Sequence, residues 1–61
     1  MNHKQWQQAE AQLPEGAKIL RTYNAFENGE LRIIVKLPGA QHETRYVARF
    51  DGEDVKLEHK P

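Results

Sequence analysis

The residues most able to do chemistry are three histidines, His3, His42 and His59, which are far apart in the sequence. None has a second histidine or a cysteine at the spacing of a metal site, so we expect no metal and no other cofactor. His42 precedes Glu43, as in an acid–base pair, but adjacent residues on a strand point to opposite faces. The chain has no serine and no cysteine, which excludes serine and thiol nucleophiles. We therefore predict that the protein is not an enzyme.

The glycines and the remaining acids indicate turns rather than a binding loop. The four glycines, at positions 16, 29, 39 and 52, are each explained by a turn or by the end of a helix, and no phosphate-binding fingerprint is present. Glu53 and Asp54 flank the last turn, where acids are usually solvated. Any function must therefore come from a surface that the fold displays.

Length and composition limit that fold. We treat residues 1–61 as a single small α+β domain with a small core. The formal net charge is zero, which argues against a surface that binds polyanions over its whole area. With no cysteine, and with no apolar run near the ~20 residues that a membrane span needs, we expect a soluble cytoplasmic protein without a membrane partner.

Patterning predicts a helix followed by four strands. Asn2 and Gln5 can form a capping box for a helix over about residues 3–13, with Trp6 and Leu13 on one face. Residues 17–26, 30–37, 42–50 and 54–59 are rich in strand formers and separated by Gly-containing turns. We predict that the helix packs on one face of a four-stranded antiparallel meander, an αββββ two-layer sandwich.

The turns predict the register. Type I′ turns at Asn28-Gly29 and Asp51-Gly52, with a four-residue loop from Pro38, place Thr22 opposite Val35, Ile33 opposite Tyr46 and Tyr46 opposite Leu57. The first turn would set Glu27 against Glu30, which favours a slightly longer loop of the same parity. The face expected to meet the helix carries Leu20, Thr22, Asn24, Phe26, Leu31, Ile33, Val35, Leu37, Thr44, Tyr46, Ala48, Phe50, Val55 and Leu57.

The opposite face is expected to be open, because the sequence predicts no second helix to cover it. It carries Ile19, Arg21, Tyr23, Ala25, Arg32, Ile34, Lys36, Arg45, Val47, Arg49 and Lys56. Tyr23, Ile34 and Val47 would form an apolar centre among cationic residues. Such a face favours a partner, a second copy or a ligand.

The same register assigns acids to half of these bases. It sets Arg49 against Asp54, Arg45 against Glu58 and Lys36 against Glu43. Three bases, Arg21, Arg32 and Lys56, have no acid opposite, so we expect them to meet an anionic partner if one binds.

We predict a non-catalytic protein-interaction module, such as a small accessory or phage-type inhibitor protein, that binds a larger protein or forms a homodimer through this face. The predicted partner-binding residues are Tyr23, Ile34, Val47, Arg21, Arg32 and Lys56. The alternative is binding of single-stranded nucleic acid or RNA, with Tyr23 stacking on a base and the cations contacting phosphates.

Overall fold

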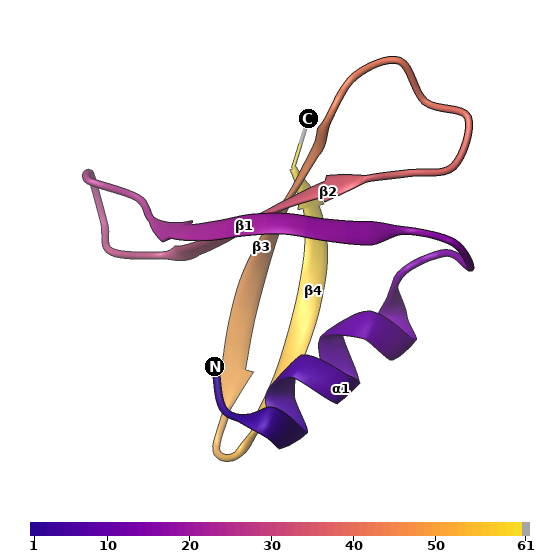
Figure 1. The fold of residues 1–61 in the computed structure, drawn as a ribbon. Helices are drawn as coiled ribbons and strands as arrows, with labels where there is room; N and C mark the ends of the chain where they lie inside the picture. Colours follow the sequence, from indigo (N-terminus) through magenta and orange to yellow (C-terminus); the bar gives the residue numbers. More distant parts are fainter. Residues whose placement is uncertain (61) are drawn as a thin grey trace.

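The computed structural model describes residues 1–60, which form one helix and one four-stranded antiparallel sheet (Figure 1). In chain order the elements are α1 (His3–Gln12), β1 (Lys18–Asn24), β2 (Leu31–Lys36), β3 (Thr44–Asp51) and β4 (Asp54–Lys60). The strands lie in the order β1-β2-β3-β4, so each pairs with its neighbour in sequence. The predicted α+β meander is confirmed.

Helix α1 begins at the predicted capping box. The Asn2 side chain accepts a hydrogen bond from the Gln5 amide, and Gln5 Oε1 accepts one from the Asn2 amide. Leu13 ends the helix in an extended conformation, as expected for a residue before proline. Gly16 then turns the chain with φ of +85°, and an added Cβ would lie 3.0 Å from Pro38 Cγ. This position therefore requires glycine on both grounds.

The core lies between α1 and the facing side of the sheet. Ala9, Ile33 and Val35 are fully buried there, and Ala48 and Val55 are nearly so. Partly buried apolar residues surround them: Met1, Leu13, Ala17, Ile19, Leu31, Leu37, Tyr46 and Leu57. The predicted core positions on β2 and β4, and Tyr46 and Ala48 on β3, are thus confirmed.

Several predicted core residues are exposed instead. Leu20 is 47% exposed, Phe50 is 50% exposed, and Phe26 lies fully exposed in the loop after β1. Thr22 and Asn24 are exposed as well. For the residues of β1 the reason is that α1 packs chiefly against β4, at the other edge of the sheet, and leaves β1 largely uncovered.

A β-bulge in β1 exchanges the roles of two adjacent residues. Ile19 lies opposite Val35 and Arg21 opposite Ile34, so Leu20 is an extra residue in this strand. Ile19 consequently packs against the core, whereas the predicted register gave that position to Leu20 and placed Ile19 on the open face. Both assignments were wrong.

In both outer hairpins the cross-strand pairing is shifted by two residues from the pairing that two-residue turns predict. Asn24 pairs with Leu31, rather than Phe26 with Leu31, which confirms the longer loop of the same parity. In the last hairpin Phe50 pairs with Val55 and Ala48 with Leu57, whereas the predicted register paired Ala48 with Val55. The central hairpin, in contrast, has the predicted pairs, such as Ile33 with Tyr46.

The last hairpin differs because Gly52 and Glu53 are the two central residues of its turn. Gly52 has φ of +61° and Glu53 does not have a positive φ, the pattern of a type II′ turn. The predicted type I′ turn would instead have centred on Asp51 and Gly52. Because the shift is two residues, each side chain keeps its face but changes its partner.

Glutamine side chains of α1 satisfy the outer edge of β4. The Val55 amide donates to Gln8 Oε1 at 2.9 Å, and the Leu57 amide donates to Gln12 Oε1 at 2.8 Å. Gln12 Nε2 also donates to the Val55 carbonyl at 2.8 Å. The side-chain amides thus occupy the place that a fifth strand would take, which protects this edge from pairing with another chain.

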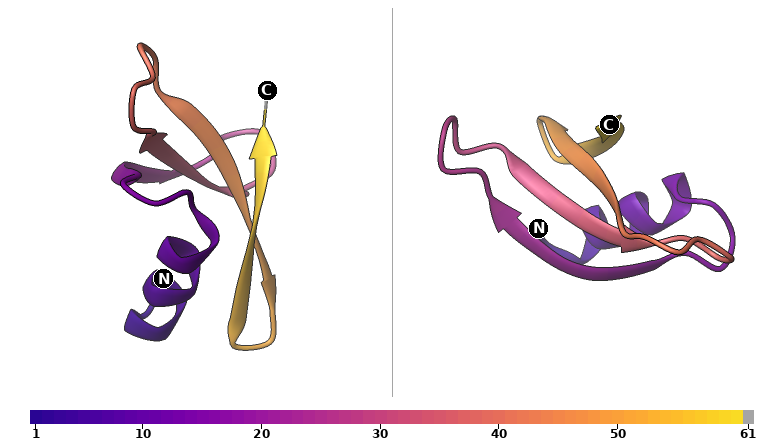
Figure 2. Two further views of the ribbon diagram at one scale, coloured as in Figure 1. Left: turned by 90° about the vertical axis from the view of Figure 1, so that its right-hand side faces the viewer. Right: turned by 90° about the horizontal axis from the view of Figure 1, so that it is seen from above.

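The sheet is strongly twisted. In Figure 1, β1 and β2 cross β3 and β4 at a steep angle, and α1 lies alongside β4. The two turned views in Figure 2 show the same arrangement, with the β1–β2 hairpin projecting away from the β3–β4 hairpin. This twist separates the first strand from the helix and keeps the helix on one side of the sheet.

Candidate interaction surface on the uncovered sheet face

The sheet face opposite α1 carries most of the positive charge of the protein. Strand alternation and the observed pairing place eight of the nine basic residues on it, all except Lys4. They are Lys18, Arg21, Arg32, Lys36, Arg45, Arg49, Lys56 and Lys60. We call this surface the cationic face. The bases of a chain with zero net charge are therefore concentrated on one face of its sheet.

Three cross-strand pairs on the cationic face join two bases. Lys18 lies opposite Lys36, Arg45 opposite Lys60, and Arg49 opposite Lys56. Directly opposite residues have Cβ atoms about 4.5–5.5 Å apart, and like charges at that distance destabilise the sheet.

Acids offset one of these pairs. Arg49 Nη1 lies 2.9 Å from Glu30 Oε2, and its Nε lies 3.2 Å from Glu58 Oε2. Arg45 and Lys60, in contrast, form no ion pair within residues 1–60. The Arg45–Lys60 pair thus has uncompensated positive charge in the described part of the chain.

The Lys18–Lys36 pair is also without an acid in this part of the chain. Lys36 Nζ donates to the Ala40 carbonyl, which is a neutral acceptor. Two uncompensated pairs therefore lie at separate positions on the face, one on β1 and β2 and one on β3 and β4.

Glu30 organises the arginines at one end of this face. It accepts hydrogen bonds from Asn28 Nδ2 at 2.9 Å and from Arg32 Nη2 at 3.2 Å, in addition to its ion pair with Arg49. The Asn28 hydrogen bond, followed by the contacts with Arg32 and Arg49, holds the pKa of Glu30 below its ordinary value. Glu30 is therefore a carboxylate at neutral pH and fixes both guanidinium groups.

Arg32 is buried, although it is charged. Its side chain is 10% exposed and pairs with Glu30, while its Nε–H has no hydrogen-bond partner within residues 1–60. A buried guanidinium with one acid partner is held mainly for position, because desolvation offsets much of the attraction. Arg32 thus lies beneath the solvent-exposed side chains of the cationic face and is not itself exposed.

The predicted apolar centre is covered as well. Ile34 and Val47 are each 3% exposed, and Tyr23 is 40% exposed. Ile34 lies between Arg21 and Arg45 on the neighbouring strands. The aliphatic stems of such long side chains cover apolar neighbours while their charged groups remain in water. Of the predicted apolar centre, only Tyr23 offers substantial surface.

The pairing of the predicted site residues also differs from expectation. Arg21 Nη2 lies 3.2 Å from Glu43 Oε2, and Arg32 pairs with Glu30, so these two bases have acid partners. Lys56 has no ion pair within residues 1–60. The predicted role of all six residues in partner binding stays a prediction.

Two of the three predicted cross-strand acids were assigned wrongly. Arg49 faces Lys56 rather than Asp54, and Arg45 faces Lys60 rather than Glu58. The two-residue shift of the last hairpin causes both errors. The third predicted acid, Glu43, pairs with Arg21 rather than with Lys36.

One sequence signal could have found the correct register. The observed pairing sets Phe50 against Val55, an apolar pair, whereas the Asp51-Gly52 turn would set Phe50 against Glu53. This apolar pair favours the shift, whereas the cross-strand charges favour the predicted register, because the observed pairing sets Arg49 against Lys56 and Arg45 against Lys60. The role of Glu30 has no comparable signal, because it depends on the positions of three side chains from one loop and two strands.

The histidines do not form a site. His42 is exposed in the loop before β3, and His59 lies on the helix side of β4, where its ring contacts Tyr46 edge-on at 5.5 Å between centroids. Residues 1–60 contain no group of three or more metal-ligating side chains. Within the same residues, no helix has the length and apolar character needed to cross a membrane.

Fold and surface together define a small α+β domain with a charged, open sheet face. No protein family, curated protein or solved structure matches this chain. The surface itself must therefore carry the functional argument.

Proposed function

We propose that this protein is a non-catalytic interaction module, and that its cationic face binds an acidic surface of a larger protein. The observation that carries the proposal is two cross-strand pairs of bases, Arg45 opposite Lys60 and Lys18 opposite Lys36, none of which forms an ion pair within residues 1–60. Each is unfavourable in the free protein. An acidic partner would convert this repulsion into attraction, which favours the complex over the free domain.

The mixed charge of the face supports a protein partner over a nucleic acid. Glu58 lies on the same face of β4 between Lys56 and Lys60, and Glu43 lies beside Arg21. A protein surface can place acids against the bases and a neutral or basic group against Glu58. A phosphate backbone is uniformly negative and cannot avoid Glu58 and Glu43 in this way.

Self-association through the cationic face is disfavoured by the same charges. In a two-fold dimer the same patch occurs on both subunits, so the bases of one copy would meet those of the other. A heterologous acidic partner suits the face better, in an accessory or inhibitory role. The absence of cysteine fits a reducing cytoplasmic compartment for this complex.

Single-stranded nucleic acid is the second candidate, and one observation favours it. Tyr23 is exposed on the same face as the eight bases, and an aromatic ring beside cations is the basis of stacking on open sheets. A single exposed aromatic offers less stacking surface than such binders usually have, which is why this candidate ranks second.

The two candidates can be compared by titrating the labelled protein with an acidic peptide and with a single-stranded oligonucleotide, followed by NMR. We expect the peptide, with acids separated by neutral or basic residues, to shift the amides of Arg45, Lys56 and Lys60. Arg45→Glu should abolish these shifts. The matched control is Lys4→Glu, because Lys4 is the base outside the cationic face.

The salt dependence gives the deciding contrast. Oligonucleotide binding that releases counterions must weaken steeply between about 50 and 200 mM salt. Tight, steeply salt-dependent binding of the oligonucleotide without peptide binding would favour the second candidate. Equal effects of Arg45→Glu and Lys4→Glu would contradict both, because the binding would then not use this face.

A further inference from the structure

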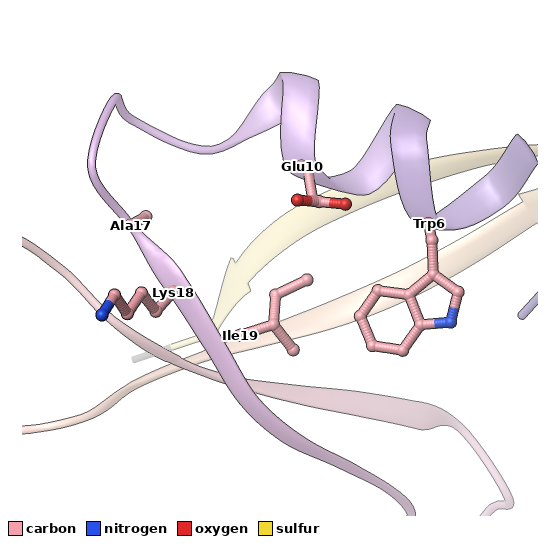
Figure 3. A pocket seen from close by; sticks show the side chains of 5 residues that line it. All are labelled: Trp6, Glu10, Ala17, Lys18 and Ile19. Carbon is pink, nitrogen blue, oxygen red and sulfur yellow. The ribbon is translucent and has the colours of Figure 1, made fainter. Parts of the chain in front are cut away.

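We infer that the wedge between α1 and β1 is a binding site for a small amphipathic amine, a molecule with an apolar body and a primary ammonium group. The wedge forms a cavity of about 350 Å³ lined by Trp6, Glu10, Ala17, Lys18 and Ile19 (Figure 3). This site adjoins the cationic face at Lys18, but its ligand and its test differ from those proposed above, and neither inference depends on the other.

The fold creates this cavity through the bulge in β1. Helix α1 packs against β4 and diverges from β1, so a gap opens between the helix and the first strand. The bulge at Leu20 turns Ile19 toward the helix, where it faces the Trp6 ring across the gap in Figure 3. Trp6 and Ile19 thus form two apolar walls, Glu10 and Lys18 make the rest of the lining polar, and Ala17, which precedes the strand, completes it.

The size of the cavity fits a small ligand. A cavity of roughly 150 Å³ is enough to hold benzene, and ligand sites begin at about 300 Å³. The observed 350 Å³ therefore accommodates an aromatic or branched aliphatic group with a short chain. A protein segment would need a longer groove than five lining residues provide.

The charge of the cavity selects the ligand's polar group. The Glu10 side chain extends from α1 into the wedge. Glu10 follows Trp6 by one helical turn, so the two side chains lie on the same face of the helix. Glu10 forms no ion pair within residues 1–60. An ammonium group beside this carboxylate would also lie near the indole ring, which attracts cations.

Lys18 does not reverse this preference. Its side chain lines the rim, but in Figure 3 its amine points away from Trp6 and Ile19. The carboxylate is thus the charged group that faces the apolar walls. A ligand with a carboxylate in place of the ammonium would be repelled by Glu10.

The protein supplies its own reporter for this site, because Trp6 is its sole tryptophan. The experiment is a titration of tryptophan fluorescence with phenethylamine, and with phenylethanol and phenylpropionate as neutral and anionic analogues of similar shape. We expect a saturable change with phenethylamine at millimolar concentration. Phenylethanol should bind about three- to fivefold more weakly, the effect of one exposed ion pair, and phenylpropionate more weakly still.

Glu10→Gln should reduce phenethylamine affinity to that of phenylethanol, while Glu27→Gln, a change at an exposed acid in a distant loop, should leave it unchanged. In NMR spectra the Trp6 indole, Ala17 and Ile19 signals should move on titration. The inference is overturned by the absence of a saturable change, by equal binding of the three compounds, or by equal effects of the two variants. The series of three compounds on the unmodified protein keeps the test valid even if Glu10→Gln misfolds.

Discussion

Glu30 shows how one side chain can hold several charges in place. Its carboxylate accepts hydrogen bonds from Asn28 and Arg32 and forms an ion pair with Arg49. Without Glu30, the buried Arg32 guanidinium would have no acid partner within residues 1–60. Removing one member of a buried charge pair is costly, because the other charge remains desolvated. The stability of the cationic face thus depends on an acid that lies in the loop before β2.

We expect Glu30→Gln to destabilise the protein at neutral pH and to flatten its response to acid. The pKa of Glu30 is lower in the folded protein than its ordinary value of 4.5. The stability that it contributes is therefore present above that pH, and it is lost as the pH falls through the lower folded value. Urea unfolding at about pH 7 and about pH 3 would measure this. A Glu30→Gln variant that loses as much stability on acidification as the parent would contradict the assignment.

Ile33 and Leu20 provide a second test at the scale of single residues. The sequence register places both in the core, but the structure buries Ile33 completely and leaves Leu20 47% exposed. Ile33→Asp should cost about 4 kcal/mol or more, because the carboxylate would be desolvated, and a domain of this size has only about 3–5 kcal/mol to lose. Leu20→Asp should leave the protein folded. Circular dichroism melting curves of the two variants would decide, and unfolding by both would support the unbulged register.

At the scale of elements, the turns predicted the parity of the sheet and missed its exact pairing. Gly29 and Gly52 each allow turns that differ by two residues, and both options keep the same side chains facing the core. The bulge could not be predicted from this sequence, since Ile19 and Leu20 are adjacent and equally apolar. Alternation alone cannot choose between them.

The contact between α1 and β4 is the element-scale feature that the sequence concealed. Glutamines on a helix are usually solvated, yet Gln8 and Gln12 bind the backbone of Val55 and Leu57. The helix therefore has two functions in the fold: its apolar side closes the core, and its amide side completes the sheet edge.

Gln12→Ala should lower the free energy of unfolding by about 0.5–1.5 kcal/mol, because water replaces only part of the interaction that a carbonyl and an amide of β4 lose. Gln7→Ala is the matched control, since Gln7 is exposed on the same helix, and it should change stability by less than about 0.5 kcal/mol. Hydrogen exchange would report the effect locally, with faster exchange at Leu57 in the Gln12 variant. Equal stability of the two variants would show that the edge contact is not important.

At the scale of the whole molecule, neutral net charge conceals an uneven distribution of the bases. Eight bases share one face of the sheet with fewer acids, among them Glu30, Glu43 and Glu58, while Glu10, Glu15 and Glu27 lie on the helix and in loops elsewhere. Composition could not reveal this, because it follows from the pairing of strands. A free domain that carries repelling charges at a fixed position is less stable than it could be, as is common for surfaces kept for binding.

That trade-off gives a prediction in which stability and binding change in opposite directions. Arg45→Gln removes the repulsion with Lys60, and Arg45→Glu replaces it with attraction. Since Gln and Glu have the same length, they cover Ile34 equally, and their comparison isolates charge. We expect the order of stability Arg45→Glu, then Arg45→Gln, then the parent, with a total span of about 0.5–1 kcal/mol.

Added salt should stabilise the parent more than Arg45→Glu, because it screens repulsion in the first and attraction in the second. Thermal unfolding at low and moderate salt measures both effects, and binding of the acidic peptide should follow the reverse order. If Arg45→Glu is less stable than Arg45→Gln at low salt, Lys60 does not act on this position. The repulsion on which the proposed function depends would then be absent from that part of the face.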